Sequence, residues 1–141
     1  MGNRARHQVQ VRWPDVDGLG HVNHSAVLSL LEVGRDAVLG ARGIPPHAYV
    51  VRRCEVDYVG ELRPLGSYVD YVCDGLTLGN TSIRVSERLL GPGGRAAVSA
   101  VFTLVLWDRD ARAARPLTAG ERELMSDLEE EAWRTGTHAL S

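Results

Sequence analysis

One long helical segment followed by four strand-like segments is the feature that most restricts the fold of this chain. Residues 25–43 carry apolar side chains at helical spacing. Residues 49–59, 67–78, 81–90 and 95–107 have the composition and apolar patterns of strands. Only short breakers separate these four segments, so we expect the strands to pair mainly antiparallel. A sheet built in this way would cover the single long helix.

The helical segment carries an apolar stripe that predicts which face is buried. The stripe consists of Val27, Leu30, Leu31, Gly34 and Val38. A helix of this length would span about 25 Å at about 1.5 Å per residue. Asn23 or Ser25 is a suitable N-cap, and the helix must end before Gly43 and the prolines that follow it.

Two further elements flank this core. Residues 7–13 alternate, which predicts a half-buried strand whose inner face carries Val9, Val11 and Trp13. At the other end, Thr118 and Glu121 form a capping-box pattern. It predicts a C-terminal helix over about 118–134, with Leu124, Met125, Leu128 and Ala132 on one face.

Together these elements predict an α+β fold, a mainly antiparallel five-stranded sheet wrapped around one long central helix, with an extra C-terminal helix. We expect one domain, residues 1–141, whose core spans about residues 7–118. A length of 141 residues and a hydrophobic content of 44% suit one such domain.

Composition also narrows the class of protein. A formal net charge of −2 gives no basic field for nucleic acid, and no apolar run is long enough to cross a bilayer. The first residues lack the apolar segment of a signal peptide. Cys54 and Cys73 lack metal-like spacing, so we expect two reduced thiols and a cytoplasmic location.

A polar junction, residues 13–24 (WPDVDGLGHVNH), lies between the first strand and the long helix. It combines two Asp, two His, one Asn and two Gly, whereas an ordinary turn needs only one or two of these residue types. The first residues of a helix carry backbone N–H groups without intrahelical acceptors, at the positive end of the helix dipole. A carboxylate just before that end can act as a nucleophile or as a general base for water. The junction therefore has the parts of an acyl-transfer site.

The segment VRWPDVDGLGHVNHSAVLSLLEVGR, residues 11–35, resembles the signature of hot-dog-fold acyl-CoA thioesterases of the 4-hydroxybenzoyl-CoA thioesterase type. The matching positions are Asp15, Asp17, Gly20, His21, Val22, Asn23, Glu32 and Arg35. The resemblance covers about residues 7–118. It departs at Val27 and Leu30, where the family usually has aromatic residues, and in the length of VGELRPLGS. These departures bear on the acyl pocket more than on the reaction.

The resemblance implies an acyl-CoA thioesterase that hydrolyses an acyl thioester to a free acid and a thiol. It assigns the catalytic carboxylate to Asp17, as nucleophile or general base, and the oxyanion donor to the backbone N–H of His24. Gly20, His21 and Asn23 would belong to the oxyanion and substrate-binding region. From the residues alone, Asp17 could instead brace its turn, Asn23 could only cap the helix, and His21 could be an ordinary turn residue.

Other residues of the signature are expected to have supporting roles. Asp15 should support the end of the strand, and Glu32 and Arg35 should form an ion pair on the helix surface or at an interface. Ser82 could line the path of the pantetheine arm, although an ordinary strand serine is the favoured interpretation. No cofactor or metal is expected, because the two histidines of the junction lie at a turn-to-helix boundary where their side chains need not converge.

The substrate and the partners remain open at this stage. An acyl-carrier-protein thioesterase is the alternative function, and a hydratase, a dehydratase or a non-catalytic acyl-CoA binding protein fits the motif less well. The single phenylalanine, Phe102, weakly favours an aliphatic acyl group over a stacked aromatic one. The resemblance and the apolar last strand predict a homodimer or homotetramer with each site at a subunit boundary. No nucleic-acid or membrane partner is expected.

Overall fold

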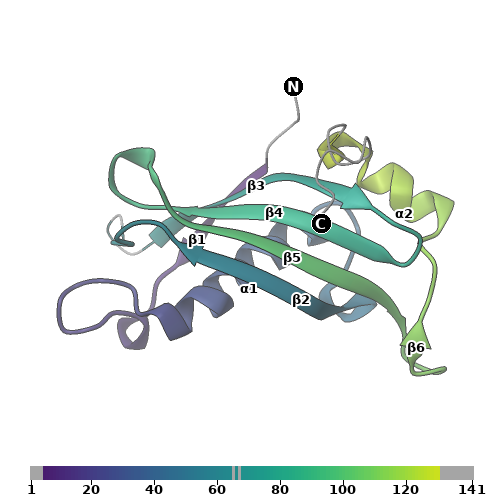
Figure 1. Cartoon of the computed structure of the whole chain (residues 1–141), viewed down its shortest axis with the longest axis horizontal. Helices are drawn as coiled ribbons and strands as arrows, with labels where there is room; N and C mark the ends of the chain where they lie inside the picture. Colours follow the sequence, from purple (N-terminus) through teal and green to yellow (C-terminus); the bar gives the residue numbers. More distant parts are fainter. Residues whose placement is uncertain (1–4, 65, 67, 131–141) are drawn as a thin grey trace.

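The computed structural model describes residues 5–64, 66 and 68–130. In Figure 1 one sheet lies in front of the long helix α1 (His24–Gly40). The strands are β1 (Ala5–Gln10), β2 (Tyr49–Tyr58), β3 (Tyr68–Leu78), β4 (Ser82–Leu90), β5 (Ala96–Asp108) and the two-residue β6 (Ala113–Ala114). Their order is β1-β3-β4-β5-β2, β6 pairs with β5, and every pair is antiparallel. The predicted α+β hot-dog architecture is confirmed.

Helix α1 buries the stripe that its sequence predicts. All five residues of the stripe are buried against the sheet. Asn23 is the N-cap, as expected, because its side-chain oxygen accepts a hydrogen bond from the backbone N–H of Ala26 at 2.9 Å. Gly34 allows a close approach between helix and sheet, since a Cβ atom there would lie 2.2 Å from Cγ of Tyr71.

The expected surface ion pair between Glu32 and Arg35 is wrong. Glu32 is exposed, whereas the Arg35 side chain is only 1% exposed and binds Glu87 of β4. Nε and Nη2 of Arg35 donate to the two carboxylate oxygens at 2.8 and 3.0 Å, and the Tyr71 hydroxyl donates to the same carboxylate at 2.5 Å. The Arg35 guanidinium also lies 3.8 Å from the centre of the Phe102 ring. A charged network therefore connects α1 to the middle of the sheet.

Two predictions about the ends of the chain are corrected. Strand β1 ends at Gln10, and a 3₁₀ turn at Trp13–Asp15 follows, so the Trp13 side chain is 90% exposed instead of buried. Pro14 is the cause, because its ring fixes φ and it has no N–H for a strand ladder.

The C-terminal helix α2 (Ala119–Leu124) begins at the predicted Thr118 cap but ends ten residues earlier than expected. A 3₁₀ turn, Ser126–Leu128, follows and buries Met125 and Leu128, while Leu124 is exposed. Ala132, which was expected to share their face, lies outside the described residues.

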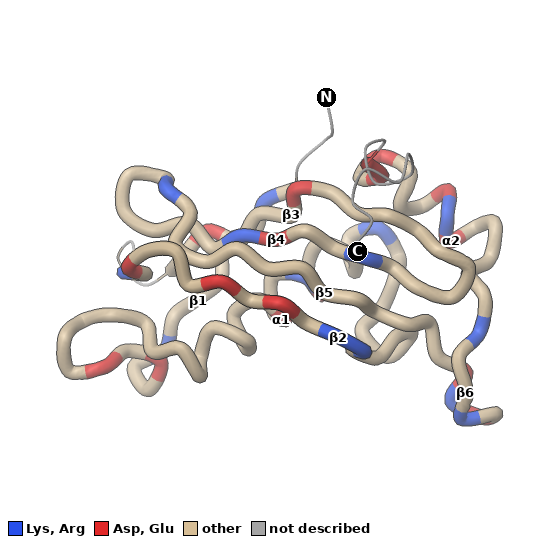
Figure 2. The backbone as a smooth tube through the Cα atoms, in the orientation of Figure 1, with Lys and Arg blue, Asp and Glu red and all other residues tan. Residues whose placement is uncertain are grey.

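Strand β2 forms one edge of the sheet, and most of its residues are exposed. The highly apolar β5, which was expected to be a central or an interface strand, lies between β4 and β2 and is therefore central. Figure 2 shows basic residues toward the start of β2 and acidic residues toward its end. Cys54 on β2 and Cys73 on β3 are both free thiols. Among the described residues, no helix is long and apolar enough to cross a membrane.

Candidate active site

The Asp17 turn, residues 17–21, is closed by hydrogen bonds from its own backbone. Oδ1 of Asp17 accepts from the N–H groups of Leu19 at 2.9 Å and of His21 at 3.1 Å. The Asp17 N–H donates to the His21 carbonyl at 2.8 Å, and the Gly20 N–H donates to the Asp17 carbonyl at 3.1 Å. Gly20 has φ +80°, which glycine adopts without steric cost. The sequence therefore fixes one oxygen of the carboxylate locally.

The other oxygen, Oδ2 of Asp17, is available to contact a substrate or a water molecule. Within residues 5–64, 66 and 68–130, no group donates a hydrogen bond to it. The backbone N–H groups of His21 and Leu19 hold the pKa of Asp17 below its ordinary value, so the carboxylate is charged at neutral pH. Asp17 is thus both a brace of its turn and an exposed anion.

The start of α1 lies beside this turn. The His24 N–H is the first of the helix and has no acceptor within it, so it points a donor away from the helix body. Asn23 fixes the chain just before the helix to the preceding turn, because its side-chain nitrogen donates to the carbonyl of Pro14 at 3.1 Å. From β2, the Tyr58 hydroxyl donates to the His24 carbonyl at 3.3 Å, and the two rings meet edge to face at 6.2 Å.

These groups border an open depression of about 520 Å³. Asp17 and residues 21–24 form one wall, and Tyr58 together with residues 60–62 forms the other. A hydrogen bond of 2.9 Å from the Val22 N–H to the Leu62 carbonyl joins the two walls. The depression therefore combines an anion, a helix N-terminus and apolar side chains.

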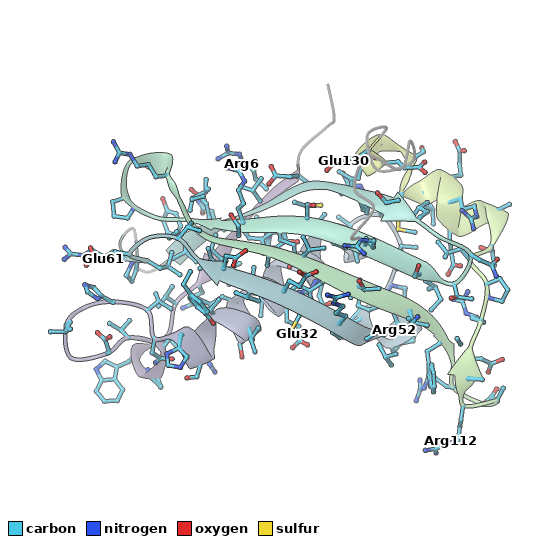
Figure 3. All side chains as sticks on the ribbon, viewed as in Figure 1. Arg6, Glu32, Arg52, Glu61, Arg112 and Glu130 are labelled. Carbon is cyan, nitrogen blue, oxygen red and sulfur yellow. The ribbon has the colours of Figure 1, made fainter. Side chains whose placement is uncertain are left out.

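A contact between His21 and Glu61 spans the depression. Nε2 of His21 lies 2.5 Å from Oε1 of Glu61, and Oε2 of Glu61 lies 2.8 Å from Nε of Arg63. In Figure 3 Glu61 projects at the end of the molecule that carries the loop before α1, and Arg112 lies at the opposite end.

The predicted site residues divide into two groups. Asp17, His21, Asn23 and His24 all line the depression, whereas Gly20 shapes the turn behind it. Asp15 is buried and accepts a hydrogen bond from the Arg12 N–H at 2.8 Å. Burial acts to raise the pKa of Asp15, but the hydrogen bonds from Arg12 outweigh it and the pKa is lowered. Asp15 therefore closes the 3₁₀ turn that follows β1, whereas the sequence predicted that it supports the end of the strand itself.

Other candidates lie away from the depression. Ser82 begins β4 and is paired with Val105, whereas Tyr58 at the depression is paired with Val98, near the other end of β5. Val27 and Leu30, where the resemblance departs from the family, are buried in the core. No three His, Cys, Asp or Glu side chains among the described residues are grouped to hold a metal ion.

The second wall was not predicted from the sequence. Tyr58 ends β2, and Glu61 and Leu62 follow that strand. They lie about forty residues after the Asp17 turn, and no local pattern indicates that they meet it. The unusual length of the VGELRPLGS segment was the available signal, because it marked this loop as different from that of the family. The complete arrangement can place a thioester carbonyl between a carboxylate and a helix N-terminal donor.

Comparison with known proteins agrees with this geometry. Residues 11–126 match the family described as the thioesterase-like superfamily. A thioesterase from Thermus thermophilus, complexed with coenzyme A and zinc, is 32% identical with a TM-score of 0.74, and the match covers 88% of this chain and 92% of that one.

Two other solved structures share the fold at lower identity. A predicted thioesterase from Bacillus stearothermophilus is 22% identical, with a TM-score of 0.75 and coverage of 91% of this chain and 98% of that one. A thioesterase-superfamily protein from Jannaschia sp. CCS1 is 20% identical, with a TM-score of 0.75 and coverage of 92% and 99%. A search of curated proteins finds no match.

Proposed function

The chain belongs to the thioesterase-like superfamily and is a thioester hydrolase, and we propose that its substrate is an acyl-CoA. Within the superfamily we propose that it is of the 4-hydroxybenzoyl-CoA thioesterase type, because of the motif at residues 11–35. The observation that carries the proposal is the exposed Asp17 carboxylate beside the first amide of α1. A cytoplasmic location remains a prediction from the sequence.

In the proposed reaction, Asp17 supplies the carboxylate and the His24 N–H stabilises the oxyanion. Hydrolysis develops negative charge on the carbonyl oxygen, and a donor at a helix N-terminus stabilises that charge in place. Asn23 supports the donor by capping α1, which fixes the position of His24. The low pKa of Asp17 keeps its carboxylate ionised under ordinary conditions.

Coenzyme A is the proposed carrier because the relative from Thermus thermophilus, 32% identical, is complexed with it. We propose an aliphatic acyl chain, because Val22 and Leu62 give the depression an apolar lining and the protein has a single phenylalanine, Phe102. A panel of aliphatic and aromatic acyl-CoAs and acyl carrier proteins, assayed for thiol release, tests both points. Faster turnover of benzoyl-CoA or of acyl carrier protein would contradict them.

Asp17→Asn tests the role of the carboxylate. The substitution keeps the size and one oxygen acceptor for the turn but removes the charge, so kcat should fall by about 10² or more. Acyl-CoA binding should stay within about three-fold, because the lost group acts mainly in the transition state.

Asp15→Asn is the matched control for this experiment. The Asp15 carboxylate is engaged by Arg12, so its loss should reduce kcat less than the loss of Asp17. Single-turnover kinetics beside a binding measurement, with circular dichroism to verify folding, separate the two. An Asp17→Asn protein that turns over a good substrate at the wild-type rate refutes the assignment.

We also propose a homodimer that pairs the two β2 edges. Val50, Val51 and Tyr58 on this strand are each more than 40% exposed, and an uncovered edge of this kind is available for pairing. A two-fold axis would set the start of one β2 against the end of the other, so arginines 52–53 would face Glu55 and Asp57. Each depression, which Tyr58 borders, would then lie at a subunit boundary. An active monomer in sedimentation at micromolar concentration would contradict this assembly.

A further inference from the structure

The His21–Glu61 pair joins the Asp17 turn to the loop that follows β2, and both residues line the depression. His21 belongs to the Asp17 turn, and its N–H and carbonyl both bind Asp17. Its imidazole turns to the other wall, where Nε2 meets Oε1 of Glu61 at 2.5 Å. The same residue therefore holds the carboxylate of Asp17 through its backbone and a second carboxylate through its side chain.

Glu61, whose side chain is 47% exposed, has a second contact besides His21. Its second oxygen binds Nε of Arg63 at 2.8 Å. The chain just before it is anchored, because the N–H groups of Val59 and Gly60 both donate to the Ala97 carbonyl, at 2.9 and 3.1 Å. A fixed carboxylate is what an imidazole needs to keep one orientation.

A carboxylate on Nε2 also fixes the tautomer of a neutral histidine. Nε2 then carries the hydrogen and Nδ1 keeps its lone pair, which is how an acidic partner prepares a histidine to accept a proton. The His21 side chain is 28% exposed and lines the depression, so water in the depression can reach the ring.

Asp17 differs from His21 in its ability to accept a proton. Two backbone N–H groups lower its pKa, which makes it a weak proton acceptor near neutral pH. A carboxylate that stays ionised is suited to attack on an activated acyl carbon, which gives an acyl–Asp17 anhydride. Hydrolysis of that anhydride requires a separate group to take the proton of the water.

We propose that His21, oriented by Glu61, accepts the proton of the water that hydrolyses an acyl–Asp17 intermediate. The proposal rests on the proposed function and commits Asp17 to the role of nucleophile. In the first step, the Asp17 oxygen bonds to the thioester carbon, the C–S bond breaks, and the thiolate leaves with the electron pair. In the second step, the water oxygen bonds to the acyl carbon while its proton moves to Nδ1 of His21. The bond between the acyl carbon and the Asp17 oxygen then breaks, the carboxylate is restored, and His21 releases its proton to solvent or to the thiolate.

Glu61→Gln tests this assignment, because it keeps the size of the side chain but removes its charge. With excess acyl-CoA, the first step should stay within about three-fold of the wild-type rate, while steady-state turnover should fall by about ten-fold or more. A burst of about one thiol per site, followed by slow turnover, is the expected signature. Glu123→Gln makes the same change at an exposed carboxylate on α2 and should leave both phases unchanged.

A second variant reports on His21 itself. His21→Ala retains the backbone hydrogen bonds to Asp17, so it should also show the burst, and imidazole added to the buffer should restore part of the slow phase. A Glu61→Gln protein that slows the burst and the steady state by the same factor, or slows neither, overturns the assignment to the second step.

These outcomes separate the two proposals. A wild-type protein that releases no thiol from any acyl-CoA, or a Glu61→Gln protein that keeps its burst when Asp17→Asn is added, overturns the proposed function and this inference together. A large loss of thiol release in Asp17→Asn, together with equal slowing of both phases in Glu61→Gln, overturns only the role of His21 and Glu61.

Discussion

Replacement of either member of the buried Arg35–Glu87 pair should destabilise the fold more than replacement of both. In Glu87→Leu the Arg35 guanidinium and the Tyr71 hydroxyl lose the acceptor that binds them at 2.5 to 3.0 Å. Both charged side chains are at most 1% exposed, so solvent cannot replace the lost partner. A stranded buried charge of this kind costs about 3–5 kcal/mol.

The double variant Arg35→Met with Glu87→Leu removes both charges and keeps an apolar side chain at each position. Because no charge is then stranded, the free energy of unfolding should fall by at most about 2 kcal/mol, of which the unpaired Tyr71 hydroxyl contributes about 1 kcal/mol. Each single variant, Arg35→Met included, should lose about 3–5 kcal/mol. The interaction energy of the cycle is therefore large.

Urea unfolding followed by circular dichroism measures these differences. All four proteins should be compared at one protein concentration, since assembly changes apparent stability. Single variants that each lose less than about 1 kcal/mol, or a double variant that loses the sum of both, would refute the interpretation of a desolvated and mutually dependent pair.

Two further predictions concern packing and acid stability. Gly34→Ala should destabilise the protein by about 1–3 kcal/mol, because the new Cβ would lie 2.2 Å from the Tyr71 ring, whereas Gly40→Ala on the same helix meets nothing within 4 Å and should be neutral or stabilising in thermal unfolding. Glu121, which receives hydrogen bonds from Arg115 and the Thr118 N–H, has its pKa lowered from 4.5 to about 2. A lowered folded-state pKa stabilises the fold above about pH 4.5, and that contribution is lost as pH falls toward 2. The stability advantage of wild type over Glu121→Gln should therefore shrink across this window in acid-unfolding curves, and a constant difference would contradict it.

The sequence predicted the elements whose buried apolar side chains recur at a regular spacing. The stripe from Val27 to Val38 marks the buried face of α1, and the breakers between the later segments mark the hairpins. The strand order was not predictable, because alternation says which side chains face inward and not which strand lies beside which. The prediction for Trp13 was wrong for a related reason, since the alternation continues past Gln10, where β1 ends, into the turn that contains Pro14.

In the candidate site and in the buried ion pair, contacts between sequence neighbours were predictable and contacts between distant residues were not. The Asp17 turn was predictable because its residues are neighbours in sequence and its turn chemistry is local. The partner of Arg35 was not, since Glu87 lies 52 residues away and an equally suitable acidic residue, Glu32, lies one turn away on the same helix. A charged residue in a helix also gives no sign from sequence alone that it faces the core.

The Asp17 turn and the loop at residues 59–62 have different consequences for the evolution of this enzyme. Among the described residues, the hydrogen bonds to the Asp17 carboxylate come from N–H groups within four residues of it. One short segment therefore sets the orientation of this carboxylate. The opposite wall joins it through the Val22–Leu62 backbone bond and the side-chain pair of His21 with Glu61. Substitutions at Leu62 should therefore reshape the proposed acyl pocket while the Asp17 carboxylate stays where it is. We therefore expect substrate range to evolve more readily through substitutions in this wall than through substitutions in the Asp17 turn.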